Sequence, residues 1–197
     1  MILRILSLVW TVAVQEPAPD STVYEIQPAS RLDVRTGRAG LLRGLGHEHH
    51  VTARVFRGRI VHFPGAPERS TVVIAVRADS LEILTDAKPS DVAKMTRAMR
   101  DETLLVTAFP EIAFTSQDVA PSDSGLRVSG QFTMVGRTRT IVTEVALAIA
   151  GDTLRARTRF PLKQTDFGIK PYGAGLGTVK VKDEVWIEID VVALRVR

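Results

Sequence analysis

Four histidines are the residues of this chain with the clearest capacity for chemistry. Three of them fall in the segment 46–50, whose sequence is Gly-His-Glu-His-His, and the fourth is His62. In an extended strand, residues two apart share a face, so His47 and His49 would point the same way. Two imidazoles at this spacing can hold Zn²⁺ or Cu²⁺, with a third ligand from His62 or from a distant carboxylate such as Asp166.

Two other roles fit His47 and His49. The first, which we favour, is structural: polar side chains that hydrogen-bond backbone groups or water. In the second, a neutral imidazole donates a hydrogen bond to an oxygen in the head group of a bound ligand. Metal binding ranks third, and the spacing alone leaves all three open. In any of these roles, imidazole could make the site sensitive to pH near neutrality.

Composition argues against several other functions. The chain has 197 residues, no Cys and a net charge of +4, with basic and acidic residues interleaved. Thiolate catalysis and Cys-based zinc sites are therefore excluded, and without a long Lys/Arg run we expect no nucleic-acid binding. The sequence also lacks a P-loop, a Gly-x-Gly-x-x-Gly cradle and a Gly-x-Ser-x-Gly elbow. We therefore expect a protein that is not an enzyme and has no cofactor; the alternative is a metal-binding protein or metal-dependent enzyme that uses His47 and His49.

Elements that could position these residues are mostly strands. Apolar residues alternate with polar ones over 71–78, 111–117, 126–134, 141–149, 154–160 and 185–191. Further strands fit 30–36 and 50–63, where Gly58 suggests a bulge or a bend. Short connections force neighbouring strands to be antiparallel, and the turns near 135–136 and 151–152 are short. About eight strands with one apolar face each close most economically into a barrel.

One segment has helical spacing instead. Val92, Met95 and Met99 recur at intervals of three and four over 89–105, and Ser90 or Asp91 could cap the helix. We expect a short helical insertion near 89–104. At the N-terminus, Arg4 precedes an apolar run of about ten residues that ends before a Pro-rich stretch, a pattern typical of an export signal. We therefore expect a signal peptide or N-terminal tail over 1–20, and a single barrel domain over 21–197.

A barrel of about eight strands is either just filled by its side chains or just able to hold one small ligand. The alternation turns mainly Val, Ile, Leu, Phe and Met inward, and an apolar interior would select an apolar guest such as a hydrocarbon chain. Periodicity alone favours the filled barrel. The candidate wall residues are Ile74, Val76, Ile112, Phe114, Val128, Phe132, Met134, Val145, Leu147, Phe160, Phe167, Ile187 and Ile189.

Six segments, in order along the chain, resemble the YceI-like family of lipocalin-like, polyisoprenoid-binding proteins. They are 24–30, 55–58, 78–81, 109–116, 129–139 and 165–169, the last reading Thr-Asp-Phe-Gly-Ile. The resemblance implies an all-β, antiparallel, lipocalin-like barrel with a helical segment at one end. It also implies a pocket for a long apolar lipid of isoprenoid quinone, polyprenyl or fatty-acyl type, whose wall would be the residues given above.

The resemblance extends to the partners and the location of the protein. It implies export to the periplasm or the exterior. We also expect transient contact with a membrane surface. The sequence does not determine the oligomeric state, and a dimer is one of the possibilities. His47, His49 and Asp166 are the candidate polar residues at the pocket mouth, although Asp166 fits a structural role in its turn better. One position departs from the family, because Gln164 replaces a basic residue before the Thr-Asp-Phe-Gly-Ile motif.

Overall fold

The computed structural model describes residues 20–39, 50–171, 173–174 and 179–196. Nearly all regular structure in them is β. The strands are β1 (Thr22–Ile26), β2 (Arg31–Ala39), β3 (His50–Ala53), β4 (Phe56–His62), β5 (Thr71–Arg77), β6 (Leu81–Leu84), β7 (Glu111–Ser122), β8 (Gly125–Met134), β9 (Arg137–Ala150), β10 (Thr153–Lys163), β11 (Gly173–Ala174) and β12 (Val179–Arg195). The helices are α1 (Pro89–Ala98), the π-helical turn η3 (Met99–Thr103) and the 3₁₀ turns η1 (Pro67–Arg69), η2 (Ala78–Ser80) and η4 (Gln164–Phe167).

Eight strands pair into a closed antiparallel ring. The order around it is β1-β4-β5-β7-β8-β9-β10-β12, and β12 returns to pair with β1. Of the other four strands, β2, β3 and β6 extend β1, β4 and β5 beyond short interruptions, and β2 pairs with the first part of β12. The two-residue strand β11 pairs with the start of β12. The expected barrel of about eight antiparallel strands is confirmed, because each ring strand pairs with a neighbour on both sides over at least part of its length.

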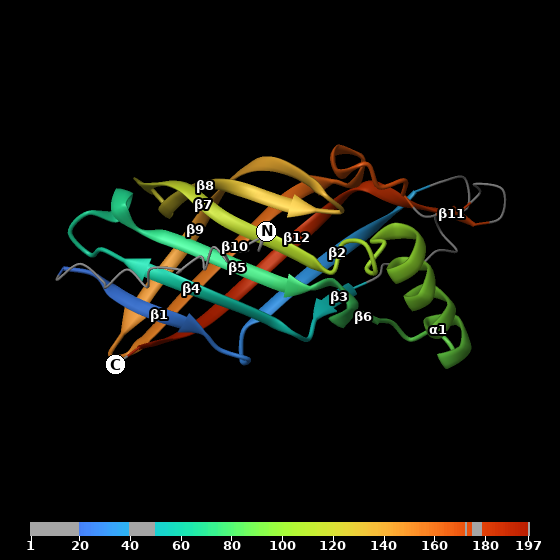
Figure 1. Cartoon of the computed structure of the whole chain (residues 1–197), viewed down its shortest axis with the longest axis horizontal. Coiled ribbons are helices and arrows are strands. Elements are labelled where there is room, and N and C mark those ends of the chain that lie inside the picture. The colour runs from blue at the N-terminus through green and yellow to red at the C-terminus, as the bar shows by residue number, and fades with distance from the viewer. Residues whose placement is uncertain (1–19, 40–49, 172, 175–178, 197) are drawn as a thin grey trace, which may run out of the picture.

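The two ends of the barrel differ (Figure 1). α1 lies at one end, beside the short strands β3 and β6, and we call this the helical end. The other end carries the last residues of β12 and the start of β1, and we call it the C-terminal end. The helical insertion expected near 89–104 is confirmed as α1 followed by η3.

Two local expectations were wrong. The first helix position is Pro89, and neither Ser90 nor Asp91 caps it, because a proline at that position already has the backbone angle that a helix requires. Gly58 lies in an unbroken register within β4, and the strand is interrupted at 54–55 instead. A Cβ on Gly58 would come within 2.6 Å of Ile26 Cδ1, so the glycine allows close packing rather than a bulge.

The alternation along β10 shows how the sequence sets the two faces of the wall. Leu154, Phe160 and Leu162 are buried inside, while the intervening arginines face outward. Arg157 Nε lies 3.1 Å from Asp190 Oδ2, and Arg159 Nε lies 3.2 Å from Glu188 Oε1. Exposed ion pairs of this kind contribute at most about 1 kcal/mol each, so the apolar inner face carries most of the stability.

Some expectations fall on residues that the structure does not describe. These are the export signal or tail over 1–20, of which only Asp20 is described, and the candidate polar residues His47 and His49. They stay predictions. None of the described helices has the length and apolar character needed to cross a membrane.

Candidate ligand-binding cavity

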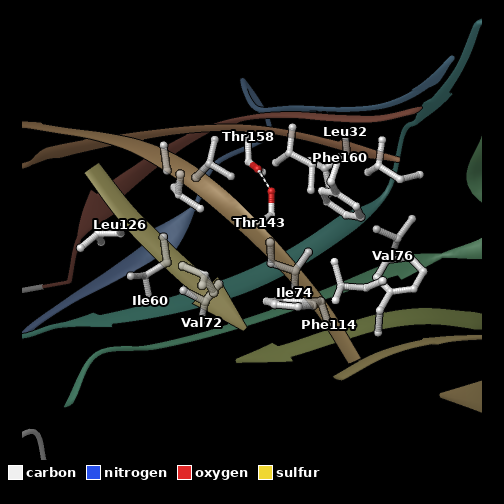
Figure 2. A pocket seen from close by; sticks show the side chains of 18 of the residues that line it. Leu32, Ile60, Val72, Ile74, Val76, Phe114, Leu126, Thr143, Thr158 and Phe160 are labelled. Atoms are coloured by element: carbon white, nitrogen blue, oxygen red, sulfur yellow. Dashed lines mark hydrogen bonds between the residues drawn. The ribbon is translucent and has the colours of Figure 1, made fainter. Parts of the chain in front are cut away.

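The barrel encloses a cavity of about 170 Å³. Of the 28 residues that line it, 23 are apolar, and they come from every strand of the ring except β1. Figure 2 shows Ile60, Ile74 and Phe114 on the wall formed by β4, β5 and β7, with Leu32 and Phe160 on the other side of the cavity. Because each strand turns every second residue inward, the wall is built by the same alternation that predicted the strands.

Eleven of the thirteen predicted wall residues line this cavity. They are Ile74, Val76, Ile112, Phe114, Val128, Phe132, Val145, Leu147, Phe160, Ile187 and Ile189. The other two, Met134 and Phe167, are buried in the core cluster beside the cavity instead. Met134 is the last residue of β8 and Phe167 lies in η4 after β10, so both belong to the packed side chains and not to the strand segments that line the cavity. Whether any of these residues contacts a ligand stays a prediction.

The sequence interpretation left out wall residues that continue the same alternation. Examples are Val72, Leu126 and Leu154, which line the cavity and share the inward face of the alternating runs predicted over 71–78, 126–134 and 154–160. Leu32 and Ile60 also line it, from strands that the sequence placed without assigning their faces. Assigning the whole inward face of each run to the wall would have found the first group.

Two hydroxyl groups inside the wall satisfy each other. Thr143 on β9 and Thr158 on β10 share a hydrogen bond of 2.5 Å, drawn as the dashed line in Figure 2. Burying a hydroxyl group costs free energy unless it has a hydrogen-bond partner. Each of these two threonines is the partner of the other, so neither hydroxyl faces the cavity unpaired. The pair therefore leaves the cavity apolar in character.

His62 and Ser70 bring polar atoms to the cavity near the C-terminal end. His62 is the last residue of β4 and lines the cavity, and burial lowers the pKa of its imidazole below the usual 6.5. The Ser70 hydroxyl accepts a hydrogen bond from the Phe63 backbone N–H at 3.1 Å. A neutral imidazole can both donate and accept hydrogen bonds, so His62 could meet an oxygen of a bound molecule.

His50 and His62 lie at opposite ends of the barrel. They are separated by twelve residues of nearly continuous strand, which corresponds to up to about 40 Å at 3.3 Å per residue. His50 Nε2 instead lies 3.1 Å from Asp33 Oδ2. Among the described residues, no three His, Asp or Glu side chains are placed to share a metal ion.

The Thr-Asp-Phe-Gly-Ile motif forms η4 and the residues after it. The Thr165 backbone N–H and hydroxyl donate to the two oxygens of Asp183, at 2.9 and 2.7 Å, and these bonds lower the pKa of that carboxyl. Asp166 is exposed on this turn. The Gln164 amide donates to the Lys182 carbonyl at 2.8 Å, so the residue that replaces the family's basic one anchors the turn to β12.

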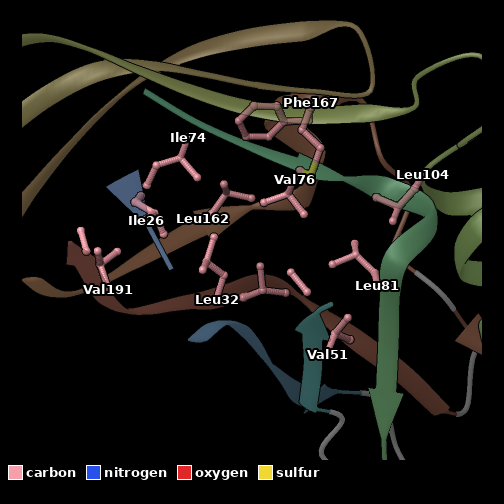
Figure 3. Packing of buried hydrophobic residues seen from close by; sticks show 14 of the residues in the cluster. Ile26, Leu32, Val51, Ile74, Val76, Leu81, Leu104, Leu162, Phe167 and Val191 are labelled. Atoms are coloured by element: carbon pink, nitrogen blue, oxygen red, sulfur yellow. The ribbon is translucent and has the colours of Figure 1, made fainter. Parts of the chain in front are cut away.

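Packed apolar side chains fill the helical end of the barrel (Figure 3). Phe167 is 1% exposed and meets Phe132 edge to face, with ring centres 5.6 Å apart. Leu81, Leu104 and Val51 complete the packing below α1. These packed side chains therefore close the cavity at the helical end.

Comparisons with known proteins agree with this architecture. The family model of the YceI-like domain matches residues 24–193. BcnA of Burkholderia cenocepacia has 18% identity and a TM-score of 0.68, covering 85% of this chain and 98% of that one. A polyisoprenoid-binding domain from Saccharophagus degradans, implicated in plant cell wall breakdown, has 12% identity and a TM-score of 0.64, covering 88% and 98%. A YceI protein of Campylobacter jejuni has 12% identity and a TM-score of 0.58, covering 75% and 84%. No curated protein matches the chain.

Proposed function

The chain belongs to the YceI-like family, and we propose that it binds a long apolar lipid inside its barrel, of isoprenoid quinone, polyprenyl or fatty-acyl type. The observation that carries the proposal is the cavity wall, in which 23 of 28 residues are apolar. Burying a methylene group stabilises a complex by about 0.8 kcal/mol, so affinity would grow with chain length. The Saccharophagus degradans domain, described as polyisoprenoid-binding, has a similar fold.

The size of the cavity limits how a chain can be held. Its volume of about 170 Å³ is close to that of an engineered apolar cavity of about 150 Å³ that holds a single benzene molecule. A chain of many carbons therefore fits only if the wall side chains move apart. The inward residues of β9 that line the cavity are half-buried, as are Ile112 and Phe114 on β7 and Ile187 and Ile189 on β12, so the wall is not tightly packed on these three strands.

Orientation of the ligand would come from the polar groups near the C-terminal end. His62 lines the cavity there, and its lowered pKa keeps the imidazole neutral at pH 7. We propose that it meets an oxygen of the head group while the chain extends toward Phe132 and Phe160. We also propose a binding role rather than an enzymatic one, and export to the periplasm or the exterior through the N-terminal segment.

A cavity-filling variant tests the proposal. Ala156 lines the cavity, and a phenylalanine there would occupy space that the chain needs, so Ala156→Phe is expected to weaken binding of a long-chain fluorescent fatty acid at least tenfold. Ala148→Phe is the matched control, because Ala148 faces outward on the paired strand β9. Equal affinities of Ala156→Phe and wild type, with both variants folded by circular dichroism, would contradict binding inside the barrel.

A further inference from the structure

The wall of the barrel contains a split between β9 and β10. Their ladder runs only from the Thr153–Ala150 pair to the Thr158–Val145 pair. Beyond it, residues 137–144 of β9 pair only with β8, and residues 159–163 of β10 pair only with β12. We call the region between these two segments the lateral split. It begins beyond the Thr158–Val145 pair and extends toward the helical end.

The sequence supplies a reason for the split. The Asp152 carbonyl accepts a hydrogen bond from the Arg195 N–H, so even-numbered residues of β10 turn their backbone groups toward β12. By alternation, the nitrogen of Pro161 faces β9. Proline has no N–H to donate, and in sheets it occurs where a ladder is absent. Pro161 therefore removes a bond that would otherwise join the two strands within the split.

Side chains, rather than backbone pairing, close the split. The Thr143–Thr158 hydrogen bond lies where the ladder stops, and it joins Thr158 of the last pair to the first half of β9. At the other end of the split, η4 follows β10 and places Phe167 against Phe132. Gly168 packs so closely on Arg137 that a Cβ would lie 2.5 Å from the guanidinium carbon. These contacts can separate without breaking a strand ladder.

The outer rim of the split has one apolar pair at its middle. Val142 on β9 is 47% exposed, and Pro161 on β10 is also exposed. Continuing the register past the Thr158–Val145 pair would set these two residues opposite each other, and would set the exposed Glu144 opposite the exposed Arg159 on the side of the ladder. An apolar chain approaching the split would therefore find one apolar side chain on each strand, beside a charged pair.

The two ends of the barrel are less open to passage. Phe167 and Leu104 fill the helical end, with 1% and 7% exposure. Near the C-terminal end, Leu154 and Val119 are 1% and 2% exposed. A closed ring of eight paired strands also cannot widen unless some ladder opens. The lateral split provides that freedom, because the first half of β9 has only one paired neighbour.

We propose that residues 137–144 of β9 form a movable flap, and that an apolar chain enters and leaves the cavity through the lateral split. The inference rests on the proposed function, since it names the route to the same cavity. Outward movement of the flap would admit the chain and enlarge a cavity that is otherwise too small for it. Closure would restore the Thr143–Thr158 and Phe132–Phe167 contacts.

A disulfide across the split tests the route. The chain has no native cysteine, and the hydroxyls of Thr143 and Thr158 already touch, so Thr143→Cys with Thr158→Cys places two thiols within bonding reach. Oxidation of this variant is expected to slow uptake and release of cis-parinaric acid at least tenfold, and reduction is expected to restore both rates. Because each protein is compared with its own reduced form, altered cavity lining does not affect the comparison.

A second disulfide is the control. Gln131 and Thr140 are paired between β8 and β9, and the Gln131 amide donates to the Thr140 hydroxyl at 3.2 Å on the outer surface. Oxidising Gln131→Cys with Thr140→Cys leaves the split free and is expected to leave both rates unchanged. A variant without cysteines, Thr143→Val with Thr158→Val, removes the hydrogen bond at similar volume and is expected to speed uptake at least threefold.

The outcomes separate the route from the function. If the oxidised Thr143–Thr158 disulfide and its reduced form take up cis-parinaric acid at equal rates, or if the double valine variant matches wild type, the chain does not enter through the split. If the wild-type protein, freed of lipid, takes up no cis-parinaric acid at all, the proposed function fails and the route fails with it. Slowing in the Thr143–Thr158 disulfide but not in the Gln131–Thr140 disulfide supports both.

Discussion

His62 places a polar, titratable side chain in the wall of a mainly apolar cavity. Burial lowers the pKa of its imidazole below 6.5, the value expected in the unfolded chain. Below pH 6.5 the unfolded state therefore binds more protons than the folded state, so this contribution to stability is present above pH 6.5 and is lost as the pH falls. A chain bound over His62 would remove more water from it and lower its pKa further.

We therefore expect binding of an apolar chain to weaken as the pH falls through the lowered pKa of His62 in the ligand-free protein. The loss should not exceed about tenfold per pH unit, the limit for a single titrating group. His62→Gln, which cannot acquire a charge, should bind with nearly constant affinity over the same range. Titrations with a long-chain alcohol, whose own charge does not change, measure this directly. An equally steep loss of affinity in His62→Gln would show that another group is responsible.

Single residues also mark how far the candidate site could be predicted from the sequence. Alternation assigned eleven wall residues to the inner face correctly, because strand residues two apart must share a face. It could not distinguish Met134, which is buried in the filled part of the barrel, since the period of a strand says nothing about position along the barrel axis. Phe167 was named from the Thr-Asp-Phe-Gly-Ile motif and is buried in the same cluster, in the turn η4. The role of His47 and His49 stays a prediction.

At the level of elements, Gly58 shows what local patterns miss. A glycine within an alternating run indicates a bulge, yet β4 keeps its register through Gly58. The residue is needed because the Ile26 side chain and the Val73 carbonyl oxygen would lie 2.6 and 2.8 Å from a Cβ at this position. Such closeness between strands distant in sequence depends on the assembled barrel, and a single sequence does not contain it.

Gly58→Ala is expected to lower the free energy of unfolding by about 1–3 kcal/mol, as overpacking of a filled site does. Gly65→Ala is the control, because a Cβ there meets no other atom within 4 Å, and it should change stability by no more than about 1 kcal/mol. Urea denaturation followed by circular dichroism gives both values. Equal stabilities of the two variants would mean that β4 moves freely away from Ile26.

The lateral split between β9 and β10 was also beyond the reach of alternation. Both strands were predicted from clear alternating runs joined by a tight turn, and the pattern is the same where the ladder is present and where it stops. Pro161 was the available signal, because a proline in a strand indicates a missing ladder. Helix α1, in contrast, was visible from its own spacing of apolar residues.

For the whole molecule, the class of fold could be predicted from the sequence, but the size of the cavity could not. Short turns and one apolar face per strand favour a closed antiparallel barrel, and the ring of eight strands confirms it. A filled barrel and one with a cavity of about 170 Å³ have the same alternation. The difference depends on how side chains from opposite walls interdigitate, which only the folded barrel determines.

The central claim is that the barrel carries a long apolar lipid. The most direct measurement is mass spectrometry of the organic extract from protein purified without detergent, followed by uptake tests on the delipidated protein. We expect one dominant class of isoprenoid quinone, polyprenyl or fatty-acyl lipid, near one molecule per chain, that rebinds after removal. An extract without such a lipid, together with delipidated protein that takes up none of these three classes, would contradict the claim.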